Sequence, residues 1–452
     1  MKLHGLVASS RGRTARNAIW NIAGSCIPLI IAAVAIPQLI KKLGADRFGF
    51  LTIVWVIIGY FGLFDFGLGR ALTNLVARFL GDGRESDTPA LTFTATTLML
   101  GMGMAGAGAL AVAAPVLVHR VLNMPLWLQP DGLRSLWAVS ASIPIVIVTT
   151  GFRGVVEAYQ RFDWSNIARI PQGIFNFAGP LVMVQFSSSL LPIVVLLLVG
   201  RIALLFAYGL MACRLLPGTQ GGRLFKGDMI RGLLSFGGWM TVSAVISPVM
   251  ASLDRFLIGT LMTMQAVTFY STPNEVVTKL LLLPAGLAGV IFPAFSTLLV
   301  SDPNEANRLY SRSVKYLTAA LLPPVAAIIL FSQGGLRVWL GVDFASHSTL
   351  PLQILSIGVL ANGLAHAPFA LIQGGGKPEW TGKLHLIELP VYLALFYPLV
   401  RSFGIAGASI AWSGRMVLDA IFLFVLASKL RTARKTETKF DFLEPSTPAA
   451  LT

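Results

Sequence analysis

Twelve apolar stretches, each close to the length of a membrane-crossing helix, constrain this chain more than any other feature of its sequence. A transmembrane helix needs about 20 predominantly apolar residues, and inside a bilayer such a stretch satisfies its backbone hydrogen bonds as a helix. The stretches lie near residues 17–39, 49–70, 91–118, 135–156, 166–186, 190–211, 235–260, 267–299, 316–332, 350–373, 384–400 and 404–428. The sequence therefore predicts an all-α polytopic membrane protein of about twelve transmembrane helices, arranged as two six-helix lobes with a central cavity.

The composition excludes a water-soluble protein. Of the 452 residues, 55% are apolar and 12% are charged, whereas soluble domains carry about 25% charged residues. The formal net charge of +15 would suggest a nucleic-acid partner in a soluble chain, but membrane topology accounts for it here and no nucleic acid is expected. Cys26 and Cys213 both fall in apolar stretches, which argues against a disulfide framework or a cysteine metal site.

The basic residues test the predicted topology, because cytoplasmic segments of membrane proteins are enriched in Lys and Arg. With a cytoplasmic N-terminus, 24 of the 35 basic residues fall in inward segments. The outward segments hold Lys41, Lys42, Arg47, Arg120, Arg134, Arg337 and Arg401. The basic start of the chain resembles a secretory signal, but its apolar run of about 23 residues is too long and another span follows it. The sequence predicts a multi-pass membrane protein with both termini cytoplasmic.

The predicted organisation has five parts. A basic cytoplasmic N-terminus covers residues 1–16, a first lobe of six helices covers 17–211, and a glycine-rich cytoplasmic linker covers 212–234. A second lobe covers 235–430, and a polar, disordered cytoplasmic tail covers 431–452. Two six-helix bundles of the same orientation are typical of transporters that bind substrate between the halves.

Charged side chains within the spans are the candidate functional residues, since each is costly in a bilayer. Three pairs are spaced four apart, so both members share one helix face and can neutralise each other. They are Arg153 and Glu157, Glu275 and Lys279, and Arg415 and Asp419. Asp254 and Arg255 are adjacent and point in different directions. They are predicted either to form a structural cluster with Glu275 and Lys279 or to act as an ion or proton gate.

Arg201 is the most informative of these residues, because it lies near the middle of a span and has no acid within four positions. Its guanidinium stays charged, so it should face an aqueous cavity, an acid of another helix such as Asp65 or Asp419, or an anionic ligand. A phosphate suits its fork of donors.

The remaining candidates follow from position. Asp65, Arg70 and Glu388 lie toward the predicted inner ends of their spans, where they either anchor the helices at the interface or line the mouth of a cavity. The candidate cavity residues are Arg201, Arg70, Asp65, Arg415 and Glu388. The candidate gate or ion-coupling residues are Asp254, Arg255, Glu275, Lys279 and Asp419. No catalytic motif, metal site or cofactor site is evident: the five histidines are scattered, and no nucleotide-binding motif occurs.

Several short motifs occur in an order and spacing that resemble one family. They are Leu43-Gly-Ala-Asp-Arg-Phe-Gly49, Phe64-Asp-Phe-Gly-Leu-Gly-Arg-Ala-Leu72, Ser252-Leu-Asp-Arg-Phe-Leu-Ile-Gly259, Phe292-Pro-Ala-Phe-Ser296 and Gln373-Gly-Gly-Gly-Lys-Pro378. With twelve spans, the chain resembles the Wzx-type polysaccharide and O-antigen flippases of the multidrug/oligosaccharidyl-lipid/polysaccharide exporter superfamily. The likeness covers roughly residues 15–430.

The resemblance implies a function and partners. It implies that the chain moves a polyprenyl-pyrophosphate-linked oligosaccharide from the cytoplasmic to the periplasmic leaflet of a bacterial cytoplasmic (inner) membrane, by alternating access of two lobes around a cationic cavity. The moved units would serve the synthesis of a surface polysaccharide such as O-antigen, capsule or exopolysaccharide. It also implies membrane lipids, a polysaccharide polymerase and a chain-length regulator as partners.

Three alternatives stay open. An ion-coupled drug or organic-cation antiporter of the same superfamily would present an unpaired carboxylate, and the first span has no acid. A lipid II flippase would resemble longer chains of fourteen spans. A membrane glycosyltransferase or ligase would need a large catalytic loop outside the membrane, and the outward segments are short, so the chain is not expected to be an enzyme.

Overall fold

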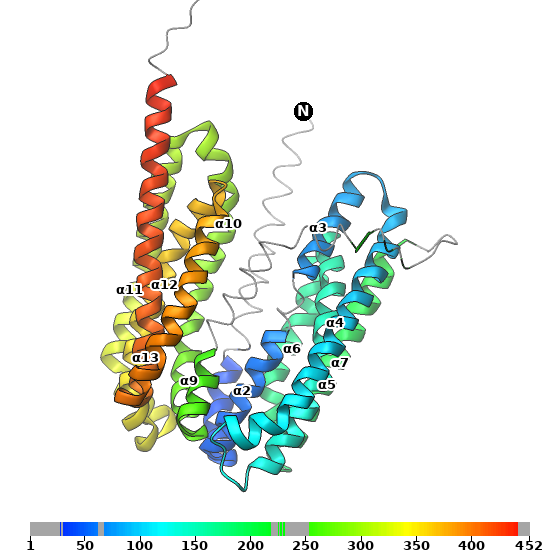
Figure 1. The fold of residues 1–452 in the computed structure, drawn as a ribbon, viewed down its shortest axis with the longest axis vertical. Helices are drawn as coiled ribbons and strands as arrows, with labels where there is room; N and C mark the ends of the chain where they lie inside the picture. The colour runs from blue at the N-terminus through cyan, green and yellow to red at the C-terminus, as the bar shows by residue number, and fades with distance from the viewer. Residues whose placement is uncertain are drawn as a thin grey trace, which may run out of the picture. The chain divides into compact units, whose positions relative to one another are not determined.

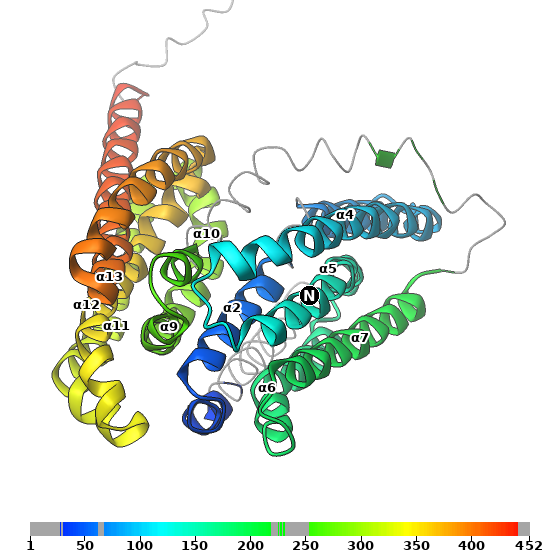
Figure 2. The ribbon, with the colours of Figure 1, turned by 60° about the horizontal axis from the view of Figure 1, so that its bottom comes forward.

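The structure is a computed structural model, and it describes residues 28, 30–61, 67–217, 225, 227, 229–230 and 253–441. All regular elements in these residues are helices. They group into two compact units that divide between Thr268 and Phe269. Figures 1 and 2 show the helices of each unit as a bundle.

In the first unit, residues 30–43 are helical, and this helix ends before Gly44. Gly44 has left-handed backbone angles (φ 78°), which suit glycine because it has no Cβ to clash in this conformation. The helices that follow are α2 (Ala45–Phe61), α3 (Leu68–Gly81), α4 (Thr88–Val116), α5 (Gln129–Ala158), α6 (Phe162–Met183) and α7 (Leu190–Leu215).

The second unit consists of long helices. They are α10 (Leu282–Ser301), α11 (Pro303–Leu340), α12 (Val342–Gly374) and α13 (Pro378–Asp441), and α9 (Met264–Thr278) crosses the division between the units. Gly404 interrupts α13 with non-helical angles (φ 59°, ψ −133°). We call residues 378–403 the first arm of α13 and residues 405–441 its second arm.

Close backbone approaches hold α5 at the centre of the first unit, against α2, α3, α4 and α7. A Cβ added to Gly103 of α4 would lie 2.5 Å from the Cα of Pro144 in α5, and one added to Gly154 of α5 would lie 2.9 Å from the backbone oxygen of Gly69 in α3. These glycines therefore allow helix contacts that any side chain would widen.

A carboxylate ties α5 to the start of α7. Asp131 accepts hydrogen bonds from the Ser189 hydroxyl (2.6 Å), the Leu190 amide (2.7 Å) and the Leu191 amide (3.2 Å). The first amides of a helix have no partner within the helix, and a negative charge is favourable there. Asp131 thus caps α7 from a neighbouring helix.

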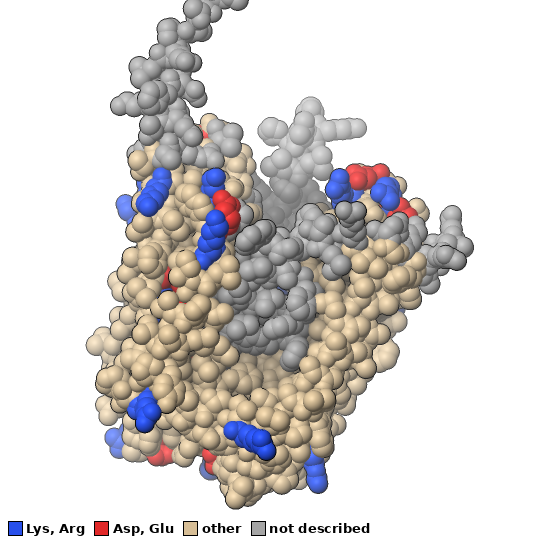
Figure 3. All heavy atoms as spheres, viewed as in Figure 1, with Lys and Arg blue, Asp and Glu red and all other residues tan. Residues whose placement is uncertain are grey.

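Six helical segments in the described residues are long and apolar enough to cross a membrane. They are Glu85–Val121, Gln129–Ala158, Leu190–Leu215, Pro303–Leu340, Val342–Gly374 and Glu379–Thr432. On the face shown in Figure 3, most visible charged side chains lie toward the ends of the bundles. The predicted all-α, multi-pass membrane fold is confirmed.

The element boundaries differ from the predicted spans in three places. The stretch 49–70 contains two helices, α2 and α3, and residues 62–66 between them lie outside the described part. The stretch 267–299 is divided by a 3₁₀ turn at Lys279–Leu281. Pro284 follows this turn, and because proline has no backbone N–H it cannot donate a hydrogen bond to the carbonyl of Leu280. Helix α13 continues to Asp441, past residue 431, so the first part of the predicted tail is helical; residues 442–452 lie outside the described part.

The predicted linker at 212–234 is largely outside the described residues. The described residues 253–268 belong to the first compact unit. The amide of Asn123 donates to the Gly259 carbonyl (2.8 Å), and the Thr268 hydroxyl donates to the Ala45 carbonyl (2.5 Å). The lobe boundaries stay a prediction.

Candidate functional site

Arg201 lies near the middle of α7, and the packing of α6 against α7 positions it. The preceding residue, Gly200, has no side chain, and a Cβ there would lie 2.5 Å from the Phe175 ring of α6. This close approach brings Asn176 of α6 to Arg201, whose Nη2 donates to the Asn176 Oδ1 at 3.4 Å. The side-chain Nε2 of Gln172 donates to the same oxygen at 3.1 Å.

Arg201 keeps unused hydrogen-bonding capacity. Its Nε is buried and has no hydrogen-bond partner among the described residues. Within the same part of the chain, neither Arg201 nor Arg169 forms an ion pair. Of the predicted environments for Arg201, a cavity or an anionic ligand therefore fits. Asp65 lies outside the described residues and Asp419 belongs to the second unit, so pairing with either acid stays a prediction.

The cavity is a pocket of about 310 Å³ in the first unit, at the lower end of the usual range for ligand sites. Three arginines line it, namely Arg153 of α5, Arg169 of α6 and Arg201 of α7. Its polar lining also includes Thr149, Thr150, Gln172, Asn176 and Tyr208. Arg153 pairs with Glu157 at 3.5 Å. Among the described residues, the other two arginines of the pocket, Arg169 and Arg201, have no acidic partner. We call this site the arginine pocket.

A hydrogen-bond network fixes the wall of the arginine pocket. The Tyr208 hydroxyl of α7 donates to the Ser165 carbonyl of α6 at 3.0 Å. The Ser165 hydroxyl lies 3.4 Å from Glu157 of α5, and Glu157 in turn pairs with Arg153. These contacts join α5, α6 and α7 beside the pocket. They do not use the guanidinium groups of Arg169 and Arg201.

A second charged pair predicted from spacing is also formed. Glu275 and Lys279 make an ion pair at 3.0 Å, as Arg153 and Glu157 do. Asp254 and Arg255 are buried, and the Asp254 carboxylate accepts from the backbone amide of Arg255 at 2.8 Å. They belong to the first unit and Glu275 and Lys279 to the second, so the four-charge cluster stays a prediction. The side chain of Arg70 lies outside what the structure describes.

The second unit contains a separate group of buried or half-buried ionisable residues between the arms of α13. His385 and Glu388 come from the first arm, and Arg415 and Asp419 from the second. The His385 Nε2 lies 3.8 Å from the Asp419 Oδ1, and ligand atoms of His385, Glu388 and Asp419 all lie within 4.8 Å of one another. We call these four residues the α13 charge group.

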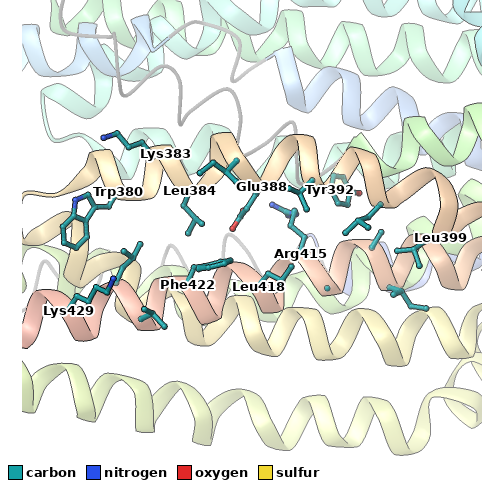
Figure 4. A pocket seen from close by; sticks show the side chains of 18 residues that line it. Trp380, Lys383, Leu384, Glu388, Tyr392, Leu399, Arg415, Leu418, Phe422 and Lys429 are labelled. Carbon is teal, nitrogen blue, oxygen red and sulfur yellow. The ribbon is translucent and has the colours of Figure 1, made fainter.

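Burial makes this group unusual. Glu388, Asp419 and Arg415 are 7%, 6% and 9% exposed. Glu388 and Arg415 also line a pocket of about 890 Å³ between the arms. Figure 4 shows these two side chains between the arms, with Trp380, Lys383 and Lys429 toward one end of the pocket. The remaining lining is mainly aliphatic.

Several members of both sites do not stand out in the sequence. The sequence singles out Arg153 only as the partner of Glu157, Arg169 lies near the predicted cytoplasmic end of the span 166–186, and His385 is one of five scattered histidines. The spacing of Arg169, Gln172 and Asn176 is the available signal, because it predicts a polar stripe on one helix face. Which basic residues meet in one pocket cannot be read from that spacing.

Known proteins resemble large parts of the chain, and one of them resembles nearly its whole length. A family described as polysaccharide biosynthesis protein matches residues 42–349. A putative O-antigen transporter of Shigella flexneri is 32% identical over 417 residues, which cover 92% of this chain and 98% of that protein. A probable low-salt glycan biosynthesis flippase of Haloferax volcanii is 26% identical over 188 residues, 40% of this chain and 38% of that protein.

A solved structure shares the fold. A multidrug resistance MATE family transporter of the MOP superfamily, in an inward-facing conformation, matches with a TM-score of 0.76 and 14% identity, covering 93% of this chain and 96% of that chain. At this identity the likeness shows the fold alone. The family match and the Shigella relative together show more, and the chain therefore belongs to the polysaccharide biosynthesis protein family of membrane proteins.

Proposed function

We propose that the chain is a flippase that moves polyprenyl-pyrophosphate-linked oligosaccharides from the cytoplasmic to the outer leaflet of a bacterial cytoplasmic membrane. It would act by alternating access during synthesis of a surface polysaccharide such as O-antigen, capsule or exopolysaccharide. The observation that carries the proposal is the arginine pocket, in which Arg169 and Arg201 have no acidic partner among the described residues. The family and the named functions of the relatives, which are transporters or flippases and not enzymes, support it.

The chemistry of the pocket suits a pyrophosphate. Guanidinium groups bind phosphate oxygens through paired N–H donors, and these charge-assisted bonds are stronger than neutral ones. The Arg201 Nε is buried with no partner among the described residues, so an anion would satisfy it. The hydroxyls of Thr149 and Thr150 also line the pocket, but both donate to carbonyls of their own helix. The arginines are therefore the charged donors that the pocket offers.

The positions of the arginines suggest a path for the anion. At 1.5 Å per residue, Arg153 lies about 8 Å from the end of α5, whereas Arg201 lies about 21 Å from the end of α7. Both ends are predicted to be cytoplasmic. A pyrophosphate entering from the cytoplasm would meet Arg153 and Arg169 first and Arg201 deeper in the membrane, while its polyprenyl tail stayed in the lipid.

The main alternative is an ion-coupled antiporter for drugs or organic cations. The inward-facing MATE structure favours it as far as fold is concerned. An excess of guanidinium groups repels a cationic substrate, however, so the arginine pocket argues against this function. A polymerase and a chain-length regulator are proposed as partners on the family resemblance alone.

Complementation of a flippase-deficient strain tests the role of the pocket. At matched expression, Arg201→Ala should fail to restore surface polysaccharide, because it removes both the charge and the donor fork. Arg201→Lys should restore it partly, because a lysine keeps the charge but not the paired donors. Full function of Arg201→Ala would remove the basis of the proposal.

Reconstitution separates the two functions. The purified protein in liposomes should expose an inner-leaflet pool of polyprenyl-pyrophosphate oligosaccharide to a glycan-trimming enzyme added outside. Protein-free liposomes are the control. Gradient-driven uptake of an organic cation without exposure of the glycan would instead identify an antiporter.

A further inference from the structure

The pocket between the two arms of α13 is a groove that small residues keep open. Ala411 and Gly414 of the second arm line this pocket of about 890 Å³. A Cβ added to Gly414 would meet no heavy atom within 4 Å, so open space lies where a larger side chain would fill the pocket. We call it the α13 groove.

Each arm presents a stripe of exposed side chains to the α13 groove, and each stripe is apolar except for a lysine at one end. The members on the first arm are Lys383, Ile387, Val391 and Leu395. The members on the second arm are Leu418, Phe422, Val425 and Lys429. Residues three or four apart share one helix face, so each arm contributes an apolar wall that ends in a positive charge.

The two lysines lie toward the same end of the α13 groove, together with Trp380 (Figure 4). Neither Lys383 nor Lys429 forms an ion pair within the described part of the chain. The charged residues of the lining are these two lysines, Arg415 and Glu388, so three positive charges face one negative charge. This end is predicted to be cytoplasmic, where anionic lipids attract basic side chains and tryptophan is common at the interface. The groove is therefore complementary to an anionic lipid headgroup.

The length of the stripes matches a lipid of one leaflet. At 1.5 Å per residue, Lys383 and Leu395 lie about 18 Å apart along the helix axis. The hydrocarbon core of a bilayer is about 30 Å thick, so the chains of one leaflet extend about 15 Å into it. A chain anchored at the lysines would thus follow the stripes to their apolar ends, whereas a chain that crosses the bilayer would be too long for them.

Another apolar groove of the structure provides a comparison. A pocket of about 630 Å³ lies in the first unit, between α4, α5 and α7, and no charged side chain of the described residues lines it. A lipid chain there would find no partner for its phosphate in the lining. The two grooves therefore differ in the headgroup dependence that their linings predict.

We propose that the α13 groove binds one anionic phospholipid of the cytoplasmic leaflet. Its phosphate lies between Lys383 and Lys429, whose ammonium groups act as point charges, and one acyl chain lies along the two stripes. In a bilayer this chain gains little from the hydrophobic effect, because the surrounding lipid is equally apolar. Selectivity therefore rests on the headgroup. The site does not depend on the proposed flippase function.

Native mass spectrometry of the purified full-length protein tests this site with phosphatidylglycerol and phosphatidylcholine that carry the same acyl chains. One phosphatidylglycerol should bind more tightly than further copies of it and more tightly than phosphatidylcholine. Lys383→Gln combined with Lys429→Gln should weaken this binding about 25-fold, because each lysine beside an anionic lipid contributes about a factor of five. The binding of phosphatidylcholine should not change.

The matched control is Lys315→Gln combined with Lys377→Gln. Both lysines are exposed in the second unit and lie outside the lining of the α13 groove, so this variant should bind phosphatidylglycerol as the wild type does. Equal binding of the two lipids by the wild type, or an equal loss in the two double variants, would refute the proposal.

A variant that fills the α13 groove tests the place of the acyl chain. Gly414→Leu puts a side chain into open space, so the protein should fold, and a photoactivatable phosphatidylglycerol should lose its cross-link to the arms of α13. Gly101→Leu of α4 also meets nothing within 4 Å and should keep the cross-link. A cross-link retained in Gly414→Leu would overturn the assigned position.

Two other occupants would be recognised by the same experiments, and either would overturn the proposal. A polyprenyl phosphate that displaces phosphatidylglycerol would assign the α13 groove to the tail of the transport substrate. A dimer that appears in the native spectra and is lost in Gly414→Leu would assign the groove to a second copy of the chain.

Discussion

Asn176→Asp tests the arginine pocket with almost no change in shape. The Asn176 side-chain oxygen lies 3.4 Å from the Arg201 Nη2, so an aspartate there would form an ion pair with Arg201. The variant would occupy the donors that the proposal assigns to a pyrophosphate, and would add a negative charge to the pocket.

The size of the effect follows from Coulomb's law. At an effective dielectric constant of about 20, unit charges about 3.4 Å apart attract by about 5 kcal/mol, and a phosphate charge about 6 Å from the new carboxylate is repelled by roughly 3 kcal/mol. The second value corresponds to about a hundredfold loss of affinity. Arg153 is exposed and solvent screening reduces the effect, so we expect a loss of at least about tenfold.

Isothermal titration of inorganic pyrophosphate into the purified variant measures this loss. Gln185→Glu is the matched control, since it adds the same charge at an exposed position just beyond the end of α6 and should leave affinity unchanged. A folded Asn176→Asp protein that binds pyrophosphate as tightly as the wild type would refute the assignment of the anion to Arg201.

Two further predictions concern stability, measured as thermal unfolding in detergent. Gly103→Ala should destabilise the protein by about 1–3 kcal/mol, because the new methyl group overpacks against Pro144. Gly101→Ala is the control: a Cβ there meets nothing within 4 Å, so this change on the same helix should be neutral or slightly stabilising. Equal effects of the two changes would contradict the role assigned to the close contact. Asp131→Ala should cost about 1–2 kcal/mol by removing the cap of α7, and an unchanged melting temperature would show that the cap contributes nothing.

The class of the protein and much of its helical plan can be predicted from the order of its residues. The predicted spans at 91–118, 135–156, 166–186 and 190–211 agree with α4, α5, α6 and α7 to within several residues. The reason is local, because a long apolar stretch in a bilayer has to satisfy its own backbone hydrogen bonds. The sequence also predicts that Arg201 has no acidic partner on its own helix, because no Asp or Glu lies within four positions of it.

Which side chains meet depends instead on the packing of the helices. Arg153, Arg169 and Arg201 come from three helices, and their convergence depends on how those helices rotate and pack. The interruption of α13 at Gly404 separates two arms whose packing brings His385 and Glu388 to Asp419. Apolar periodicity determines that a helix exists, but not which of its polar residues faces a neighbour distant in sequence, because that depends on contacts between helices.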